Sequence, residues 1–285
     1  MADGTTCVVQ VTHTASRGFV SRALLMSEDL HGSDGLEHHV LAWDDARDGT
    51  VCASLQAALP SPHTTVSCIT TPDIINRLPG TIRMPANLSA PMAGRCRTAK
   101  GLNPKWFAWN AADAVYLAWF DRTRCRTYWF VEYDVAWNGN AMALFSHFQA
   151  RPYDYICSAP RPLDLLGLDK GWKHTAKRCG QVPPKAVTCQ IQVVRASRRL
   201  LELAANWSAT PHNSLYCEMR LASLCESAEW CTTGNLLAAD MFGSFTADTN
   251  GLRNPTSFSW DSNPVVPRAG RQRHDRTRFY HRVKD

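Results

Sequence analysis

The chain has 285 residues, of which 45% are hydrophobic and 20% charged, so it is long and apolar enough to bury a core. This composition excludes a disordered or fibrous protein, and no apolar stretch has the length of a membrane span. The net charge of +6 is uneven, because residues 268–285 hold seven basic and two acidic residues. The rest of the chain is therefore close to neutral.

The eleven cysteines include no C-x-x-C pair, which argues against a zinc ribbon and a thioredoxin-like redox site. Cys7, Cys68 and Cys157 lie in apolar runs, where a reduced cysteine packs as a small hydrophobic residue. We therefore expect reduced cysteines and a cytoplasmic protein. The glycosylation sequons at Asn87 and Asn206 keep a second compartment open, that of a lumenal, Golgi-type enzyme lacking its anchor.

The first part of the chain alternates between strand and helix patterns. Residues 6–11, 38–43 and 64–69 predict strands, and helical patterns fit 18–30 and 50–59 between them. This alternation predicts an α/β fold in which a mostly parallel sheet has helices on both faces.

Polar residues follow the first two of these strands. Thr12 and His13 come after one strand and Asp44 after the next. Ligands of parallel sheets bind at the carboxyl ends of the strands, so these residues are candidate contacts. Ordinary loop polarity is the alternative interpretation.

The middle of the chain predicts a long loop at 78–105, where Gly, Pro, Asn and Arg occur without periodicity. A helix is expected to begin at Asn110, which can cap it, and Asp113 lies three residues later as in a capping box.

The next segment, 128–131, is continuously apolar and predicts a buried strand that ends in Glu132 and Asp134. Alternate residues of a strand point to the same side, so the two carboxylates can converge on one divalent cation. Mg²⁺ and Mn²⁺ prefer oxygen ligands and commonly share them with substrate phosphates. A salt-bridged strand end is the alternative.

The second half of the chain is less regular. No single pattern fits 213–231, and we expect loops at 159–184 and irregular structure beyond Thr232. The remaining signals predict a helix at 140–149, strands at 153–158 and 187–194, and a helix that Ser197 caps.

The stretch YWFVEYDVAWNGN, preceded by WNAADAVYLAW and followed by DYICSAP, resembles a poorly characterised group of GT-A type glycosyltransferases. Enzymes of this type carry a DxD or ExD motif at a strand end, and Glu132-Tyr133-Asp134 is similar to it. The resemblance is close over 105–160 and loose elsewhere. It implies a catalytic domain at 1–267, with a nucleotide-binding half at 1–135 and an acceptor half at 136–267.

The resemblance also implies a metal ion and an acceptor-side base. Mn²⁺ or Mg²⁺ would be held by Glu132, Asp134 and His281, because many enzymes of this type place a C-terminal histidine on the metal. Glu218 is similar in position to the catalytic carboxylate near the acceptor, although Met219 stands where the family has an aspartate. A surface glutamate is the alternative for Glu218.

The donor would be a UDP- or GDP-sugar and the acceptor a glycan or another hydroxyl-bearing molecule. The tail at 268–285 is interpreted as an active-site lid, with a basic surface arm as the alternative. For Asp113 a helix cap is preferred over a donor contact. The residues that would contact the donor are Thr12, His13, Asp44, Asp113, Arg282 and Lys284.

Two other classes of function stay open on the sequence alone. One is another metal-dependent nucleotide enzyme, such as a nucleotidyltransferase. The other is a non-catalytic protein that binds glycans or nucleic acid through tryptophan-rich grooves or the basic tail. We expect no nucleic-acid partner for the preferred function.

Overall fold

The computed structural model describes residues 4–44, 49–59, 62–79, 112–162, 185–210, 217–239, 241 and, for the backbone alone, 278–281. Most of the two loops expected at 78–105 and 159–184 lies outside these residues.

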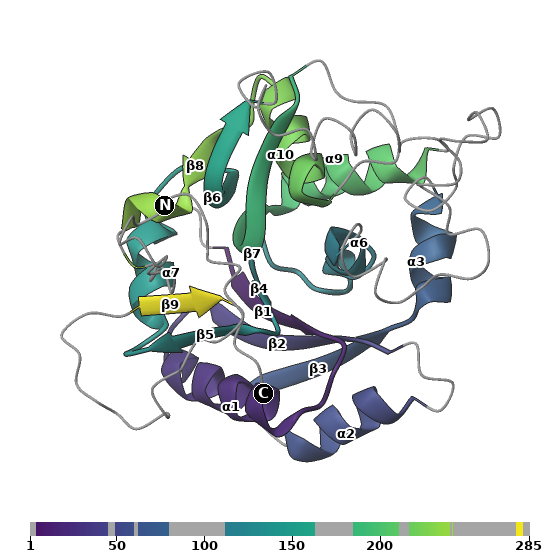
Figure 1. Ribbon diagram of the computed structural model, residues 1–285, viewed down its shortest axis with the longest axis vertical. Helices are drawn as coiled ribbons and strands as arrows, with labels where there is room; N and C mark the ends of the chain where they lie inside the picture. The colour runs from purple at the N-terminus through teal and green to yellow at the C-terminus, as the bar shows by residue number, and fades with distance from the viewer. Residues whose placement is uncertain are drawn as a thin grey trace, which may run out of the picture.

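A seven-stranded sheet forms the centre of the molecule, in the order β3-β2-β1-β4-β7-β6-β8 (Figure 1). The pairs among β3, β2, β1 and β4 are parallel, whereas β7 runs antiparallel to both β4 and β6. The strands are β1 (Thr6–Thr12), β2 (Leu36–Trp43), β3 (Thr64–Ile69), β4 (Thr127–Glu132), β6 (Tyr155–Pro162), β7 (Val187–Ser197) and β8 (Thr233–Asn235).

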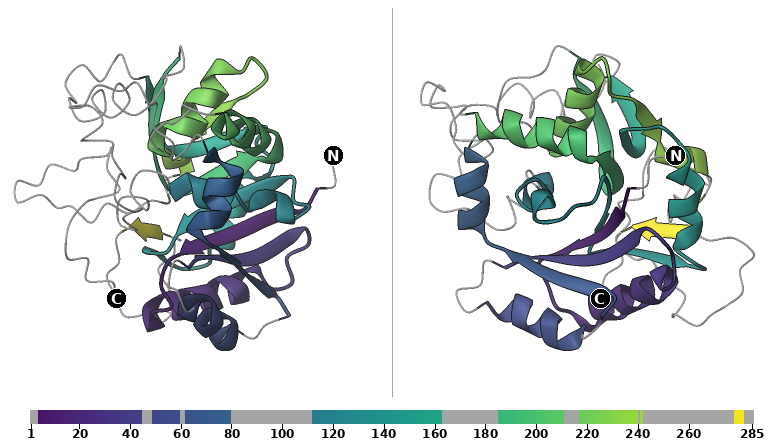
Figure 2. Two further views of the ribbon diagram at one scale, coloured as in Figure 1. Left: turned by 90° about the vertical axis from the view of Figure 1, so that its right-hand side faces the viewer. Right: turned by 180° about the vertical axis from the view of Figure 1, so that it is seen from behind.

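Helices cover both faces of this sheet, which confirms the predicted α/β class (Figure 2). One face packs against α3 (Thr71–Arg77), α6 (Ala112–Leu117), α9 (Arg198–Ala209) and α10 (Cys217–Ser227). The other packs against α1 (Arg17–Leu30), α2 (Thr50–Ala58) and α7 (Met142–Gln149). The described residues also include the 3₁₀ turns η2 (Phe120–Arg122) and η4 (Leu236–Ala239). Among the described residues, no helix has the length and apolarity that crossing a bilayer requires.

A separate two-stranded sheet joins distant parts of the chain. β5 (Val135–Asn138) follows β4 after a two-residue turn and pairs antiparallel with β9 (Arg278–His281). Neither strand was predicted. Gly139, with φ of 77°, ends β5 and confirms the turn expected at that point.

Most predicted elements have the expected type, and the main differences are in helices. Ser197 caps α9 as predicted, its hydroxyl accepting a hydrogen bond from the Leu200 amide. α3 was not predicted, although Thr70 and Asp73 form a capping box at its start. The segment 213–231, for which no pattern fitted, contains α10, and nine of its eleven residues are buried.

The expectation of reduced cysteines is wrong for six of the described ones. Within the described residues, disulfides link Cys7 to Cys125, Cys52 to Cys68 and Cys225 to Cys231. It is confirmed for three buried residues, Cys157, Cys189 and Cys217, which are free. Apolar sequence context did not separate the two kinds because a disulfide is buried as readily as a thiol.

Candidate active site

The predicted contact residues lie at the carboxyl ends of three neighbouring parallel strands. Val11 of β1 is in register with Glu132 of β4, and Thr12 is in register with Ala42 of β2. Thr12 and His13, Asp44, and the Glu132–Asp134 segment therefore lie along one edge of the sheet. This is the edge at which sheets of this kind bind ligands.

The acidic motif divides between a strand and a turn. β4 ends at Glu132, and Tyr133 and Asp134 form the turn that leads into β5. Strand alternation therefore does not extend to Asp134, contrary to the reasoning from the sequence. The two carboxylates also have different neighbours, since Glu132 acts electrostatically on Cys217 and Asp134 on His13.

His13 lies beside this turn. Its ring meets the Tyr133 ring edge to face, with 4.4 Å between the centroids. Partial burial of the His13 ring removes water from it and lowers the pKa of the imidazole. The negative charge of Asp134 partly offsets this shift. The turn is also held from α1, because the Arg22 guanidinium donates a 2.9 Å hydrogen bond to the Tyr133 carbonyl.

β9 brings the C-terminal segment to the same turn. In the antiparallel pairing of β5 with β9, His281 is the register partner of Val135. The backbone of His281 is thus opposite the residue that directly follows Asp134. The side chain of His281 is not described, and Arg282 and Lys284 lie outside the described residues, so their roles stay predictions.

On the α6 and α10 side of the sheet, Asp113 forms an ion pair with Arg220. The two side chains are 0% and 1% exposed, so this is a fully buried pair of charges. Burial raises the pKa of Asp113 to about 6, and the Arg220 guanidinium opposes that shift. Asn110 lies outside the described residues, so the capping box remains a prediction, whereas the contact with Arg220 was not foreseen.

Glu218 lies in the first turn of α10 and is 7% exposed, so the surface alternative for this residue is wrong. The pKa of the neighbouring Cys217 thiol indicates which charged groups lie near the start of α10. Burial raises the pKa of the Cys217 thiol, and the carboxylates of Asp113, Glu218 and Glu132 raise it further. The Arg220 guanidinium opposes this shift, so three carboxylates and one cation act electrostatically on one buried position.

Asp44 and Thr12 have structural contacts at the same edge. The Asp44 carboxylate accepts a 2.8 Å hydrogen bond from the Cys52 amide in the first turn of α2. The Thr12 hydroxyl donates to the Thr14 carbonyl at 2.8 Å and accepts from the Thr14 amide at 3.0 Å. Both residues shape the edge of the sheet, and contact with a nucleotide stays a prediction for them.

Sequence reasoning missed two residues of this region, Arg220 and Cys217, which are both buried. Tyr116 is buried as well, and its ring stacks on Phe130 of β4 with 3.9 Å between centroids. An arginine in a helix without a clear apolar stripe gives no signal of burial.

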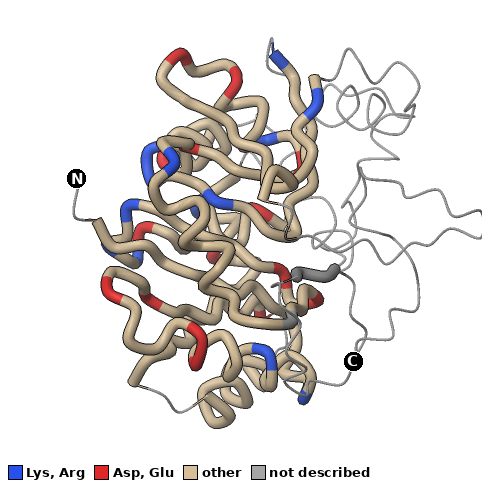
Figure 3. The backbone as a smooth tube through the Cα atoms, turned by 90° about the vertical axis from the view of Figure 1, so that its left-hand side faces the viewer, with Lys and Arg blue, Asp and Glu red and all other residues tan. Residues whose placement is uncertain are grey.

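Acidic and basic residues are interspersed on the side of the described fold shown in Figure 3.

No protein-family model matches the chain, and no curated protein matches it. Solved structures with a similar chain path include the galactosyltransferase LgtC in complex with donor and acceptor sugar analogues. It has 12% identity and a TM-score of 0.41, over 80% of this chain and 73% of that one.

Two further structures are also glycosyltransferases. Mouse xyloside xylosyltransferase 1, in its apo form, has 10% identity and a TM-score of 0.40, over 82% of this chain and 85% of that one. The mannosyltransferase PcManGT from Pyrobaculum calidifontis, in complex with GDP-Man and Mn²⁺, has 13% identity and a TM-score of 0.37, over 70% and 46% of the two chains. At such values nothing is transferred residue by residue, so the function is inferred from this chain's own side chains.

Proposed function

We propose that this chain is a metal-dependent glycosyltransferase that moves a sugar from a nucleotide-sugar donor to an acceptor hydroxyl. The observation that carries the proposal is the pairing of β5 with β9. It returns the C-terminal segment to the carboxyl end of β4, with His281 opposite Val135 and next to Asp134. The backbone of a histidine thus lies beside the segment that carries two carboxylates, where parallel strands end.

The donor set fits a divalent cation such as Mn²⁺ or Mg²⁺. Glu132 and Asp134 offer carboxylate oxygens, and His281 offers an imidazole nitrogen, which Mn²⁺ also accepts. When bound, such an ion neutralises charge on the departing nucleoside diphosphate. The carboxylates of Glu132 and Asp134 have different neighbours. Asp134 directly precedes Val135, the register partner of His281, so we assign Asp134 as the principal ligand and Glu132 as the assisting one.

The chain's own residues would handle the acceptor. Glu218 is buried in the first turn of α10, next to Cys217, whose thiol also interacts electrostatically with Glu132 of β4. A carboxylate so placed is suited to take the proton of an acceptor hydroxyl as it attacks. Arg220 and Asp113 would fix the start of α10, on which Glu218 lies.

The remaining residues would bind the donor. Thr12, His13 and Asp44 line the edge over which the nucleotide would lie, and Arg282 and Lys284 would contact the diphosphate. Disulfides are maintained in oxidising compartments, so the three observed pairs favour the lumenal alternative, while the compartment itself stays a prediction.

The test is calorimetric binding of UDP and GDP with and without Mn²⁺. We expect His281→Ala and removal of 279–285 each to weaken the Mn²⁺-dependent affinity by about 10–100-fold, the range seen when metal sites lose supporting contacts. Arg273→Ala, which alters the charge of the same tail, serves as the matched control and should change little. Equal affinities in all four proteins would contradict the role of the tail.

A panel of nucleotide sugars then tests the chemistry. Slow hydrolysis or transfer from a UDP- or GDP-sugar, dependent on Mn²⁺ or Mg²⁺, is the expected result. Turnover of nucleoside triphosphates instead would support a nucleotidyltransferase. Metal-independent binding of nucleic acid that falls steeply with salt, with no turnover, would support a binding protein.

A further inference from the structure

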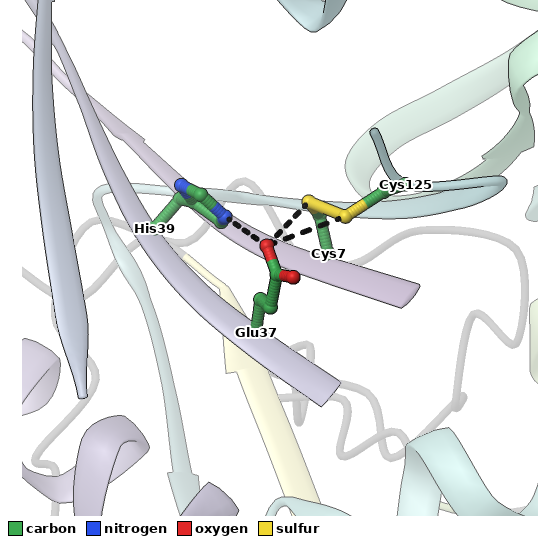
Figure 4. Close-up of side chains that lie close together, drawn as sticks. All are labelled: Cys7, Glu37, His39 and Cys125. Atoms are coloured by element: carbon green, nitrogen blue, oxygen red, sulfur yellow. Dashed lines mark hydrogen bonds and ion pairs between the residues drawn. A yellow bond between two sulfur atoms is a disulfide. The ribbon is translucent and has the colours of Figure 1, made fainter. Parts of the chain in front are cut away.

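A second polar cluster lies near the amino ends of the same strands. Cys7 of β1 is in register with Glu37 of β2, His39 follows two residues later on the same side, and Cys125 precedes β4. Figure 4 shows the four side chains directed toward one another. One ligand atom from each lies within 4.8 Å of the others, and the described residues contain no second group of this kind.

The distances from Glu37 Oε2 to the other three ligand atoms resemble those of a tetrahedral zinc site. Glu37 Oε2 is 3.2 Å from His39 Nε2, 3.7 Å from Cys125 Sγ and 4.0 Å from Cys7 Sγ. With zinc–sulfur bonds of about 2.3 Å and zinc–oxygen and zinc–nitrogen bonds of about 2.1 Å, tetrahedral angles give about 3.4 Å between O and N and about 3.6 Å between O and S. The observed distances differ from these values by about 0.4 Å or less.

Burial gives the cluster a closed interior and an open entrance. Cys7 and Cys125 are fully buried, and His39 is 6% exposed. The His39 ring lies at an angle to Trp119, with 5.2 Å between centroids, a contact that restricts its orientation while Nε2 faces Glu37. The Glu37 side chain is 53% exposed, so an ion can reach the cluster from solvent past this carboxylate.

We infer that Cys7, Cys125, His39 and Glu37 bind a zinc ion when the Cys7–Cys125 pair is reduced. The structure shows the oxidised pair. A dithiol reductant would break the S–S bond, each sulfur would gain a proton, and the reductant would become a disulfide. Zinc would then displace the two thiol protons and bind both thiolates, the imidazole nitrogen and the carboxylate.

The disulfide and the zinc site exclude each other. Two sulfurs on one tetrahedral zinc lie about 3.8 Å apart, whereas bonded sulfurs lie about 2.0 Å apart. Neither of the two further disulfides within the described residues belongs to such a group. The Thr233 hydroxyl lies 3.3 Å from the Cys225 sulfur. The Cys225–Cys231 pair is therefore the matched control.

The test uses the full chain, reduced with a dithiol, desalted without oxygen and titrated with Co²⁺ in place of zinc. We expect one equivalent to give thiolate-to-cobalt charge-transfer absorption and excess zinc to remove it. None of the ligands proposed at the carboxyl ends of the strands is a thiol, and the absorption is assigned to this cluster by its loss in Cys125→Ser, so failure here leaves the proposed glycosyltransferase activity untouched.

Variants assign the ligands. Cys125→Ser should abolish the absorption, Glu37→Gln should weaken Co²⁺ binding by at least about tenfold, and Cys225→Ser should change neither. Zinc should also slow alkylation of Cys7 and Cys125 but not of Cys225, as read by mass spectrometry. If Cys125→Ser does not fold, Glu37→Gln decides, because its side chain is half exposed. Unchanged affinity in Glu37→Gln, or absence of the absorption in the reduced parent, would overturn the inference.

Discussion

The two ends of the strands β1, β2 and β4 carry different chemistry on one sheet. At the carboxyl ends lie the carboxylates of Glu132 and Asp134, to which the proposed metal site adds the imidazole of His281. At the amino ends lie two sulfurs, an imidazole and one carboxylate. Under the two proposals, Mn²⁺ or Mg²⁺ would bind the first set and zinc the second, so a single α/β sheet would keep two metal chemistries apart.

The two ends also differ in how their polar groups are held. The carboxyl end is anchored by Asp113 and Arg220, a buried ion pair that stabilises only while both partners are present. The amino end is anchored by a covalent bond between Cys7 and Cys125. Changes at one end should therefore affect activity, and changes at the other should affect metal and thiol chemistry.

The largest effect is expected from Asp134→Asn, which removes a ligand charge without changing volume. Transfer should fall by about a thousandfold or more, because a metal ion contributes several kcal/mol of transition-state stabilisation. Glu132→Gln should be milder. Steady-state kinetics with Mn²⁺ measures both, and thermal unfolding checks that the fold is kept.

Cys125→Ser, at the amino ends of the strands, is the control for Asp134→Asn and should leave the rate of sugar transfer within a few fold of the parent.

Full transfer activity of Asp134→Asn in the presence of EDTA would contradict the metal assignment at the carboxyl ends of the strands.

Glu218→Gln should lower kcat by about two to four orders of magnitude, the usual loss when a general base is removed. Donor affinity should be nearly unchanged, because Glu218 is assigned to the acceptor. Glu226→Gln, an exposed position of the same helix, is the control and should behave as the parent. Near-parental kcat in Glu218→Gln would mean that the base lies elsewhere.

The anchor of the carboxyl end can be broken separately. Asp113→Asn or Arg220→Met should each destabilise the fold by about 3–5 kcal/mol, because each leaves one buried charge without its partner. The double change Asp113→Leu with Arg220→Met should cost much less than the two single costs together. Urea unfolding measures this coupling, and simple additivity of the two changes would argue against the pair.

The smallest expected effect is on the pH dependence of folding stability, through the buried His38 of β2. His38 is buried, with Nε2 3.0 Å from Gln10 Oε1 and Nδ1 2.9 Å from Thr64 Oγ1, and burial lowers its pKa to about 3. Between about pH 6.5 and 3 the unfolded chain binds a proton that the folded chain does not. Stability should therefore fall on acidification, by up to about 1.4 kcal/mol per pH unit.

His38→Asn should reduce this pH slope, and the exposed His147→Asn should not. Urea midpoints between pH 4 and 7 give the slopes. Asp113 acts in the opposite direction between its ordinary pKa of 3.8 and about 6, so the informative quantity is the difference between parent and variant. Equal slopes in all three proteins would contradict burial of a neutral His38.

Local signals sufficed for the strands around the site. The β-branched and aromatic runs of β1, β3 and β4 predict strands because such residues pack well on a pleated, buried surface. The polar residues that follow them were placed correctly at one edge, since parallel strands all end there.

What the sequence could not supply depends on contacts between distant segments. α10 has no amphipathic period because it is buried nearly all round. The pairing of β5 with β9 joins segments far apart in the chain, and four-residue strands have little signal of their own. The same holds for the Cys7–Cys125 bond, whose partners are 118 residues apart.

That bond has a consequence for how the chain folds. Thr6 and Thr127 are register partners, so the link between Cys7 and Cys125 keeps the amino ends of β1 and β4 close together even in the unfolded chain. Closing a loop of 118 residues beforehand removes about 5 kcal/mol of chain entropy from the unfolded state. It also turns the longest-range contact of the central sheet into a nearly local one, and such contacts form fastest during refolding. A cross-link at the amino end thereby helps to assemble the strand whose other end carries Glu132.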